Sequence, residues 1–153
     1  MSIVYLGLGS NLGNKEENLQ RAVSLLSAKV GRVLRQSSFY TFKSWGYASK
    51  NDFINVVILM ETDLCPLDLL NETQRIEKEI GRKEKTDNNR YSDRAIDIDI
   101  LFYNDEIINH HNLKIPHSLI TERDFVLTPL AEIAPDYVHP LNGKTITELK
   151  QQH

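Results

Sequence analysis

The order in which two apolar patterns alternate along the chain restricts its fold more than any single motif does. Some segments are apolar at nearly every position, which is typical of strands with at least one buried face. Others repeat an apolar residue every three or four positions, which is typical of helices. The resulting order is strand, helix, strand, strand, helix, strand. It predicts a ferredoxin-like α+β sandwich, with an antiparallel sheet, both helices on one face of it, and extra C-terminal elements.

The same patterns give approximate bounds for the elements. The expected strands cover residues 3–8, 33–40, 53–60 and 96–103. The buried stripe of the first helix contains Leu19, Ala22, Val23, Leu26 and Val30, and Gly31 is expected to cap its end. The second helix begins at Pro66, ends before Gly81 and buries Leu69, Thr73, Ile76 and Ile80. Residues 41–52 and 82–94 are predicted loops, and a short helix is expected at about 126–134.

Length, charge and cysteine content exclude several classes of protein. With 153 residues, the chain is expected to form a single domain, residues 1–153. A net charge of −3 argues against a nucleic-acid binder, which usually carries a basic surface. One cysteine, Cys65, excludes an internal disulfide and fits a reducing compartment. Neither a signal sequence nor an apolar run of roughly 18 residues is present, so we expect a cytoplasmic protein with no membrane partner.

The last predicted strand carries two carboxylates on one face. Because strand side chains alternate, Asp97 and Asp99 project from the same side, roughly 7 Å apart along the backbone. Two carboxylates this close repel each other, and a divalent cation relieves that repulsion. Mg²⁺ prefers one or two carboxylates together with waters and substrate phosphates. The alternative is that both aspartates face solvent from an edge strand.

An amide interrupts the apolar strand 53–60. Asn55 is costly to bury unless its donors and acceptors are satisfied, and these would suit a flat heterocycle with alternating polar groups. Phe53 lies on the same strand face and could stack beside such a ring. The equally plausible alternative is that Asn55 caps a neighbouring loop. The glycine-containing segment 7–13 matches neither of the common nucleotide-binding glycine motifs, and a tight turn is the stronger interpretation.

Several other polar residues are ambiguous by themselves. The segment 82–94 is rich in cations, which is typical of a solvated loop but also suits charge neutralisation during phosphoryl transfer. Gln74 and Glu77 are three residues apart and share a helix face, as exposed residues often do. His117, Arg123 and Phe125 form a last cluster with no decisive pattern.

Taken together and in order, these segments resemble a known family, that of 6-hydroxymethyl-7,8-dihydropterin pyrophosphokinase of folate biosynthesis. The resemblance covers about residues 3–140, and its most specific part is the segment from Arg94 to Leu101. The motifs that carry it are Tyr5–Gly13, Phe53-Ile54-Asn55, Gln74-x-x-Glu77-x-x-x-Gly81-Arg82, Arg94-x-x-Asp97-x-Asp99, Pro116-His117 and Arg123-x-Phe125-Val126-Leu127-x-Pro129-Leu130.

The resemblance implies an activity and a role for each site residue. ATP would donate a diphosphate to the hydroxymethyl group of the pterin, giving AMP and the pterin diphosphate, in a monomeric enzyme. Two Mg²⁺ ions would be held by Asp97 and Asp99, and Arg82 and Arg94 would stabilise charge on the β-phosphoryl group. The nucleotide site would contain Gln74, Glu77, Ile100, His117 and Arg123. The pterin site would contain Trp45, Phe53, Asn55 and Phe125.

The chain departs from the family pattern in three places. Residues 41–47 replace a proline-rich run, the loop before Arg94 is about two residues longer with Tyr91 in place of a tryptophan, and Ser118 replaces an aromatic residue. We expect the loops 41–52 and 82–91 to close when both substrates bind. Two other functions remain as alternatives: a small-ligand or RNA-binding module of the same fold, of which the acidic strand disfavours RNA binding, and a regulatory ligand-binding domain without turnover.

Overall fold

The computed structural model describes residues 1–43, 52–81, 95–118 and 120–153. The predicted site residues Trp45, Arg82 and Arg94 lie outside these ranges, as do Tyr91 and most of the two predicted loops, with their expected closure.

Within these ranges, the main antiparallel sheet has five strands, four of which follow the order β2-β4-β1-β5. These four are β1 (Ser2–Ser10), β2 (Gly31–Gln36), β4 (Phe53–Thr62) and β5 (Asp97–Tyr103). Because β1 and β4 are the inner strands, their apolar runs are buried on both faces. Strand β1 lies between β4 and β5, and β2 lies at the outer side of β4. This is the ferredoxin-like strand order, so the predicted fold is confirmed.

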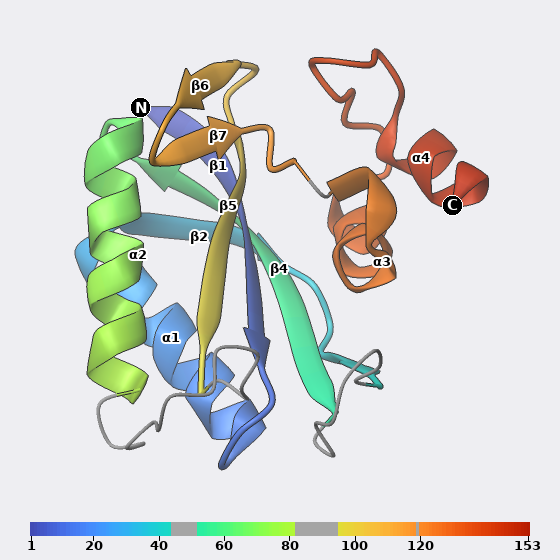
Figure 1. Ribbon diagram of the computed structural model, residues 1–153. Coiled ribbons are helices and arrows are strands. Elements are labelled where there is room, and N and C mark those ends of the chain that lie inside the picture. The colour runs from blue at the N-terminus through green and yellow to red at the C-terminus, as the bar shows by residue number, and fades with distance from the viewer. Residues whose placement is uncertain (44–51, 82–94, 119) are drawn as a thin grey trace.

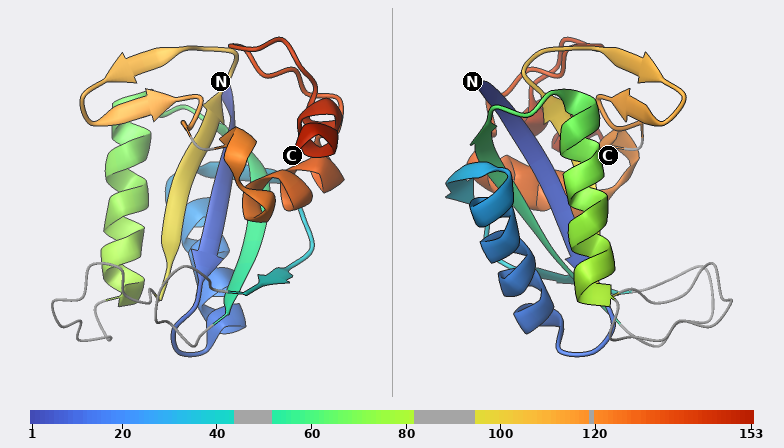
Figure 2. Two further views of the ribbon diagram at one scale, coloured as in Figure 1. Left: turned by 45° about the vertical axis from the view of Figure 1, so that its right-hand side comes forward. Right: turned by 90° about the vertical axis from the view of Figure 1, so that its left-hand side faces the viewer.

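The helices divide between the two faces of this sheet (Figure 1). The right-hand view of Figure 2 shows α1 (Lys15–Lys29) and α2 (Pro66–Gly81) side by side in front of the strands. Their predicted stripes pack on side chains such as Val56 and Ile58 of β4. The opposite face carries α3 (Asp124–Ile133) and α4 (Ile146–Gln152). Helix α3 corresponds to the short helix expected at about 126–134. There Leu127 and Leu130 pack with Val57 and Leu101 in a second core.

The predicted strand 33–40 is wrong in one respect, because it is interrupted. β2 ends at Gln36, and Ser37 then bonds to β4 through both its backbone and its side chain: its N–H donates to the carbonyl of Val57, and its hydroxyl accepts from the N–H of Val57. A separate strand, β3 (Tyr40–Phe42), follows on β4. The expectation of a loop from residue 41 is therefore also wrong for Thr41 and Phe42.

Gly31 does not cap the first helix as predicted. Val30 is the cap residue, and Gly31 begins β2 opposite Thr62 of β4. A Cβ atom at Gly31 would lie 1.8 Å from the carbonyl oxygen of Glu61, so only glycine permits this close approach of the two strands. Gly81 is the last residue of α2 rather than the first one beyond it.

The part of the chain after β5 is more regular than expected. A hairpin of β6 (Ile108–His110) and β7 (Leu113–Ile115) folds back over the upper ends of α2 and β5 (Figures 1 and 2). A short 3-10 helix, η1 (Ile120–Glu122), leads into α3. Thr145 and Glu148 form a reciprocal capping box that begins α4. In the described ranges, no helix has both the length and the apolar character needed to cross a membrane.

Candidate active site

The sheet face toward α3 gathers the polar residues that the sequence singled out. On β5, Asp97 and Asp99 share this face with Leu101, whereas Ile98 and Ile100 point into the core on the other side. The strand register places Gly9 of β1 between Asp97 and Asn55, since it is the Cα partner of both. Asp97 and Asn55, which are distant in sequence, therefore flank Gly9, and Asp99 lies beside Gly7 on the same face.

Glycines on β1 leave this face without side chains between the aspartates and the amide. A Cβ atom at Gly9 would lie 2.7 Å from Nδ2 of Asn55, closer than real Cβ contacts, and one at Gly7 would lie 3.4 Å from Leu101. The strand therefore forms a floor of backbone rather than a packed side-chain layer. Such a floor lets a flat ligand approach the sheet closely.

Asn55 is buried at 8% exposure, and its Oδ1 accepts no hydrogen bond from any described residue. Leaving a buried carbonyl oxygen unpaired costs free energy, and a bound ligand that donates a hydrogen bond to it would remove this cost. Phe53 lies two residues away on the same strand face and is half-buried. The alternative role for Asn55 was to cap a neighbouring loop. Among the described residues, no loop N–H donates to Oδ1 of Asn55.

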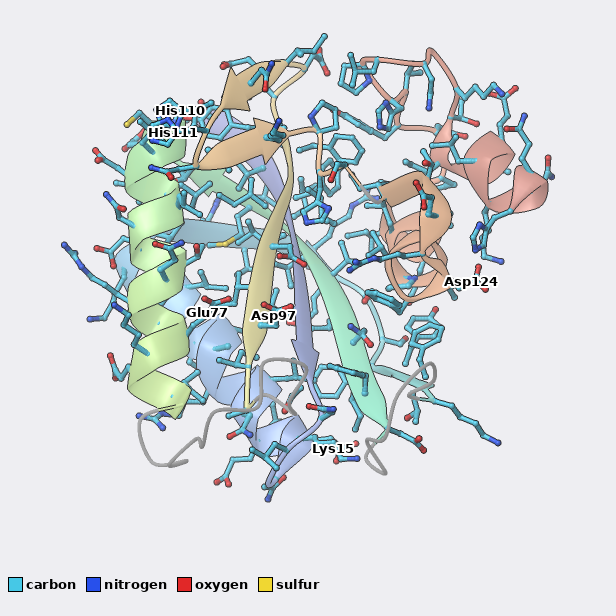
Figure 3. All side chains as sticks on the ribbon, in the orientation of Figure 1. Lys15, Glu77, Asp97, His110, His111 and Asp124 are labelled. Atoms are coloured by element: carbon cyan, nitrogen blue, oxygen red, sulfur yellow. The ribbon has the colours of Figure 1, made fainter. Side chains whose placement is uncertain are left out.

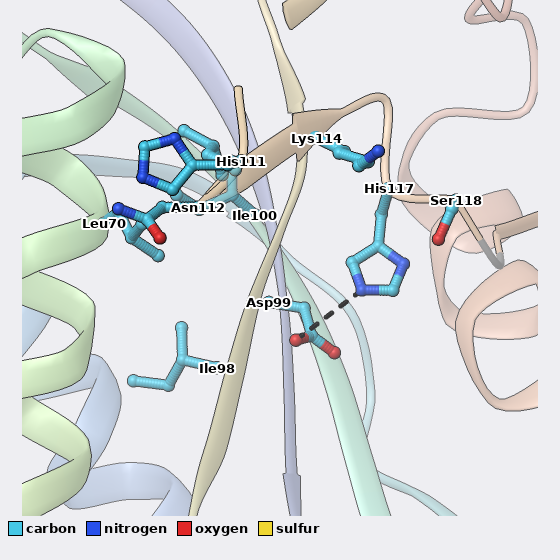
Figure 4. Close-up of a pocket in the computed structure, with 10 residues that line it drawn as sticks. Leu70, Ile98, Asp99, Ile100, His111, Asn112, Lys114, His117 and Ser118 are labelled. Carbon is cyan, nitrogen blue, oxygen red and sulfur yellow. Dashed lines mark ion pairs between the residues drawn. The ribbon is translucent and has the colours of Figure 1, made fainter. Parts of the chain in front are cut away.

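The acidic pair lies beside a histidine. Asp97 and Asp99 are both half-buried, and Nε2 of His117 is 3.7 Å from Oδ1 of Asp99 (Figure 4). The backbone N–H of His117 donates to the carbonyl of Leu101, which fixes the histidine beside β5. Burial lowers the pKa of His117, the Arg123 guanidinium lowers it further, and Asp97 opposes both effects.

A pocket of about 290 Å³ opens between β5, α2 and the β6–β7 hairpin (Figure 4). Its walls combine the first half of β5 with α2, the hairpin and the segment that follows it: Leu70, Ile98, Asp99, Ile100, His111, Asn112, Leu113, Lys114, His117 and Ser118. The hairpin residues His111, Asn112 and Lys114 were not singled out from the sequence. Strands of three residues give too little periodicity to be recognised, and only the hairpin fold brings Lys114 to this pocket.

Among the described strands, β5 is at the edge of the sheet, so the backbone groups along its outer edge are not paired with another strand of the sheet. Glu77 of α2 reaches toward β5 near Asp97 (Figure 3), and its Oε2 accepts from the N–H of Ile98 at 2.7 Å. Since alternate residues of a strand direct their backbone groups to the same edge, the N–H and carbonyl of Ile100 also face outward, although its side chain lies in the core. Gln74, one helical turn before Glu77, is exposed.

Aromatic and cationic residues at the start of α3 lie on the same side of the sheet as the glycine floor. The guanidinium of Arg123 lies 5.1 Å from the ring centre of Phe125. The Phe125 ring contacts that of Phe42 on β3, with 6.3 Å between centres and 65° between planes. Because Phe42 is the Cα partner of Phe53 across the β3–β4 ladder, Phe42 connects Phe125 to the strand that carries Asn55. Phe42 was not predicted to belong to the site, because the predicted loop concealed its strand.

The structure thus brings most of the predicted residues to one region, comprising the α3 face of the sheet and the adjoining outer edge of β5. Phe53, Asn55, Asp97, Asp99 and Phe125 lie around the glycine floor, and Ile100, His117 and Glu77 lie around the pocket beside it. Among the described residues, no three His, Cys, Asp or Glu side chains are placed to hold a metal ion together.

Fold and site together define an α+β protein with an acidic pair and a recessed amide on one sheet face, next to a pocket of about 290 Å³. Comparison with known proteins is more specific. A model of the 7,8-dihydro-6-hydroxymethylpterin-pyrophosphokinase (HPPK) family matches residues 5–135. The chain therefore belongs to this family.

Individual relatives agree. The 2-amino-4-hydroxy-6-hydroxymethyldihydropteridine pyrophosphokinase of Aquifex aeolicus is 39% identical over 153 residues, covering 100% of this chain and 93% of its own. The protein of the same name from Porphyromonas gingivalis is 43% identical over 141 residues, covering 92% and 95%. The wild-type HPPK-DHPS of Plasmodium falciparum, crystallised with SDX-DHP, shares the fold, with a TM-score of 0.80 at 20% identity. This chain matches along 99% of its length and spans 43% of that longer chain.

Proposed function

We propose that this chain transfers the terminal diphosphate of ATP to the hydroxymethyl group of 6-hydroxymethyl-7,8-dihydropterin, giving AMP and the pterin diphosphate. Family membership supports the reaction class. The observation that carries the substrate assignment is the buried Oδ1 of Asn55, which no described residue satisfies and which lies across a glycine floor from two carboxylates.

The pterin would lie on the β1 floor with its polar edge against Asn55. An amide presents both donors and an acceptor, and a pterin ring edge offers their complements. The rings of Phe53 and Phe125 would enclose its faces, since aromatic stacking favours a flat heterocycle and excludes water. This placement directs the hydroxymethyl group toward Asp97 and Asp99, on the far side of Gly9. Trp45 would complete the pterin site, as the family resemblance implies.

ATP would occupy the 290 Å³ pocket. The outward backbone groups of Ile100 would meet the base, and Gln74 and Glu77 would line that side. His117, Lys114 and Arg123 lie where the phosphates would pass toward Asp99. His117 can donate a hydrogen bond in its neutral form, which its lowered pKa favours. The planar guanidinium of Arg123 suits bidentate contact with phosphate oxygens.

The carboxylate pair fits Mg²⁺. Two half-buried aspartates on one strand face offer the hard oxygen ligands that this ion prefers, and substrate phosphates would supply the others. We propose that Asp97 and Asp99 hold two Mg²⁺ ions. When bound, the ions would neutralise phosphate charge and clamp the attacking and leaving oxygens.

The reaction itself is a displacement at phosphorus. The hydroxymethyl oxygen forms a bond to the β-phosphorus, the bond from that phosphorus to the α,β-bridging oxygen breaks, and AMP departs with this oxygen while the hydroxyl proton is released. Such a step depends on alignment and charge neutralisation more than on covalent catalysis. Asn55 and the phenylalanines supply alignment, and Arg82 and Arg94 would stabilise the charge that develops on the β-phosphoryl group.

One assay tests the proposal. The purified chain is incubated with ATP, Mg²⁺ and 6-hydroxymethyl-7,8-dihydropterin, and the nucleotide products are separated. AMP should accumulate in equal amount with pterin diphosphate, and neither should form without pterin. Release of ADP would contradict diphosphate transfer, and binding without turnover would indicate a regulatory domain. We also propose a monomer, as the family resemblance implies, which gel filtration coupled to light scattering would test.

A further inference from the structure

Three hydrogen-bond donors converge on the carboxylate of Glu132, near the end of α3. The backbone N–H of Ser38 donates to Oε1 at 2.9 Å, the hydroxyl of Ser38 donates to Oε2 at 3.1 Å, and the hydroxyl of Tyr40 donates to Oε1 at 2.8 Å. The donors precede Glu132 by 92 or 94 residues. This is therefore a long-range connection between α3 and the segment that joins β2 to β3.

The same face of α3 also carries Phe125. Residues seven positions apart lie two turns apart on one side of a helix, so Phe125 and Glu132 both face β3. Phe125 contacts the ring of Phe42, and Glu132 bonds to Tyr40. Helix α3 thus holds the three-residue strand β3 at both of its ends.

Strand β3 in turn pairs with the part of β4 that forms the proposed pterin site. Tyr40 is the Cα partner of Asn55, and Phe42 is the partner of Phe53. On the other side of the connection, Nη1 of Arg35 donates to the carbonyl of Ile133 at 2.8 Å. A shift of β3 relative to α3 would therefore change the distance between Phe125 and the strand that carries Asn55.

We propose that Glu132 is a positioning residue of the pterin site. It holds β3 and α3 in a fixed relative position, so that the space between Phe53 and Phe125 beside Asn55, the aromatic slot, retains its width. This inference rests on the proposed function. Glu132 itself lies outside the slot and touches no part of the predicted substrate positions. Its role is exerted through Tyr40 and Ser38.

The electrostatics agree with this geometry. The bond from the Ser38 backbone, followed by that from Tyr40, lowers the pKa of Glu132, so the carboxylate is ionised at neutral pH and accepts all three bonds. The same contact raises the pKa of Tyr40, which keeps its hydroxyl protonated and able to donate. Glu132 is exposed to solvent, so its loss should loosen the slot rather than unfold the chain.

Three variants separate positioning from general destabilisation. Glu132→Ala removes all three acceptors, whereas Glu132→Gln retains a carbonyl oxygen for the Ser38 backbone and Tyr40. Glu148→Ala breaks the capping box of α4, which includes neither Ser38 nor Tyr40, and controls for loss of stability alone. For each, calorimetry measures the Kd of ATP with Mg²⁺, and then the Kd of pterin in the presence of a non-hydrolysable ATP analogue.

For Glu132→Ala we expect pterin Kd to rise about five- to tenfold while ATP Kd stays within about twofold. Glu132→Gln and Glu148→Ala should stay within about twofold of the wild type for both ligands. An unchanged pterin Kd in Glu132→Ala, equal losses for both ligands, or the same loss in Glu148→Ala would overturn the inference. If the wild-type chain itself binds no pterin, the proposed function fails instead, so the two failures are distinguishable.

Discussion

A Cβ atom at Gly9 would lie 2.7 Å from Nδ2 of Asn55, so the absence of a side chain on β1 is what leaves the amide in its place. The register that makes Gly9 the partner of both Asn55 and Asp97 also makes it the centre of the proposed site. The backbone of one inner strand therefore separates the residue proposed to recognise the pterin from the carboxylates proposed to hold Mg²⁺.

Gly9→Ala should impair pterin binding selectively. The added methyl group displaces the Asn55 amide and occupies part of the floor, so we expect pterin Kd to rise about tenfold. ATP Kd should change little, because the pocket does not include Gly9. Gly7→Ala alters the same floor but leaves Asn55 in place, since its Cβ meets Leu101 at the ordinary distance of 3.4 Å, so the rise in pterin Kd should be smaller. Equal effects of the two substitutions on pterin binding would contradict the assignment.

Asn55→Ala should separate function from stability. Loss of the amide leaves the pterin edge unpaired, at a cost of about 1–3 kcal/mol, or roughly 5- to 150-fold in pterin Kd. The unfolding free energy should change less than for a typical core truncation, because the removed Oδ1 has no described donor. Calorimetry and urea denaturation measure the two quantities. A large loss of stability with equal losses for both substrates would show that Asn55 is structural.

Much of this site could be predicted from side-chain periodicity, and the rest depended on long-range pairing. Alternation alone placed Asp97 and Asp99 on one face, and the helical stripe of α2, including Thr73 and Ile80, is buried as expected. Strand β3 was missed because a serine side chain replaces ladder pairing at Ser37, which ends β2 without any glycine or proline signal. Lys114 was missed because its short hairpin acquires a pocket-facing side only by packing over β5.

His139 should make stability depend on pH. Burial lowers its pKa below the ordinary value of 6.5, so the unfolded chain binds more protons than the folded one between the two pKa values. Its contribution is therefore most favourable above pH 6.5, decreases as pH falls below that value, and levels off below the folded pKa. Nδ1 of His139 accepts from the N–H of Leu141 at 3.2 Å, which also requires an unprotonated nitrogen.

His139→Asn tests this prediction, because Oδ1 of asparagine can accept the same bond from Leu141 but does not titrate. Urea denaturation between pH 5 and 8 should show a shallower decline at acidic pH than the wild type. His111→Asn, in the exposed hairpin turn, is the matched control and should keep the wild-type slope. Parallel profiles for all three proteins would rule out His139 as the titrating group.

Asp97→Asn and Asp99→Asn should each lower kcat at least about a hundredfold while the chain stays folded. Removing one of two neighbouring like charges relieves repulsion in the metal-free protein, so thermal stability without Mg²⁺ should hold or rise. Mg²⁺-dependent tightening of ATP binding should weaken in parallel with turnover, because a neutral amide is a poorer ligand for this ion. Asp136→Asn, at an exposed position outside the site, controls for loss of surface charge. Wild-type turnover in both variants would contradict the metal assignment, whereas loss of turnover with unchanged Mg²⁺ response would assign the carboxylates to the substrate rather than to the ion.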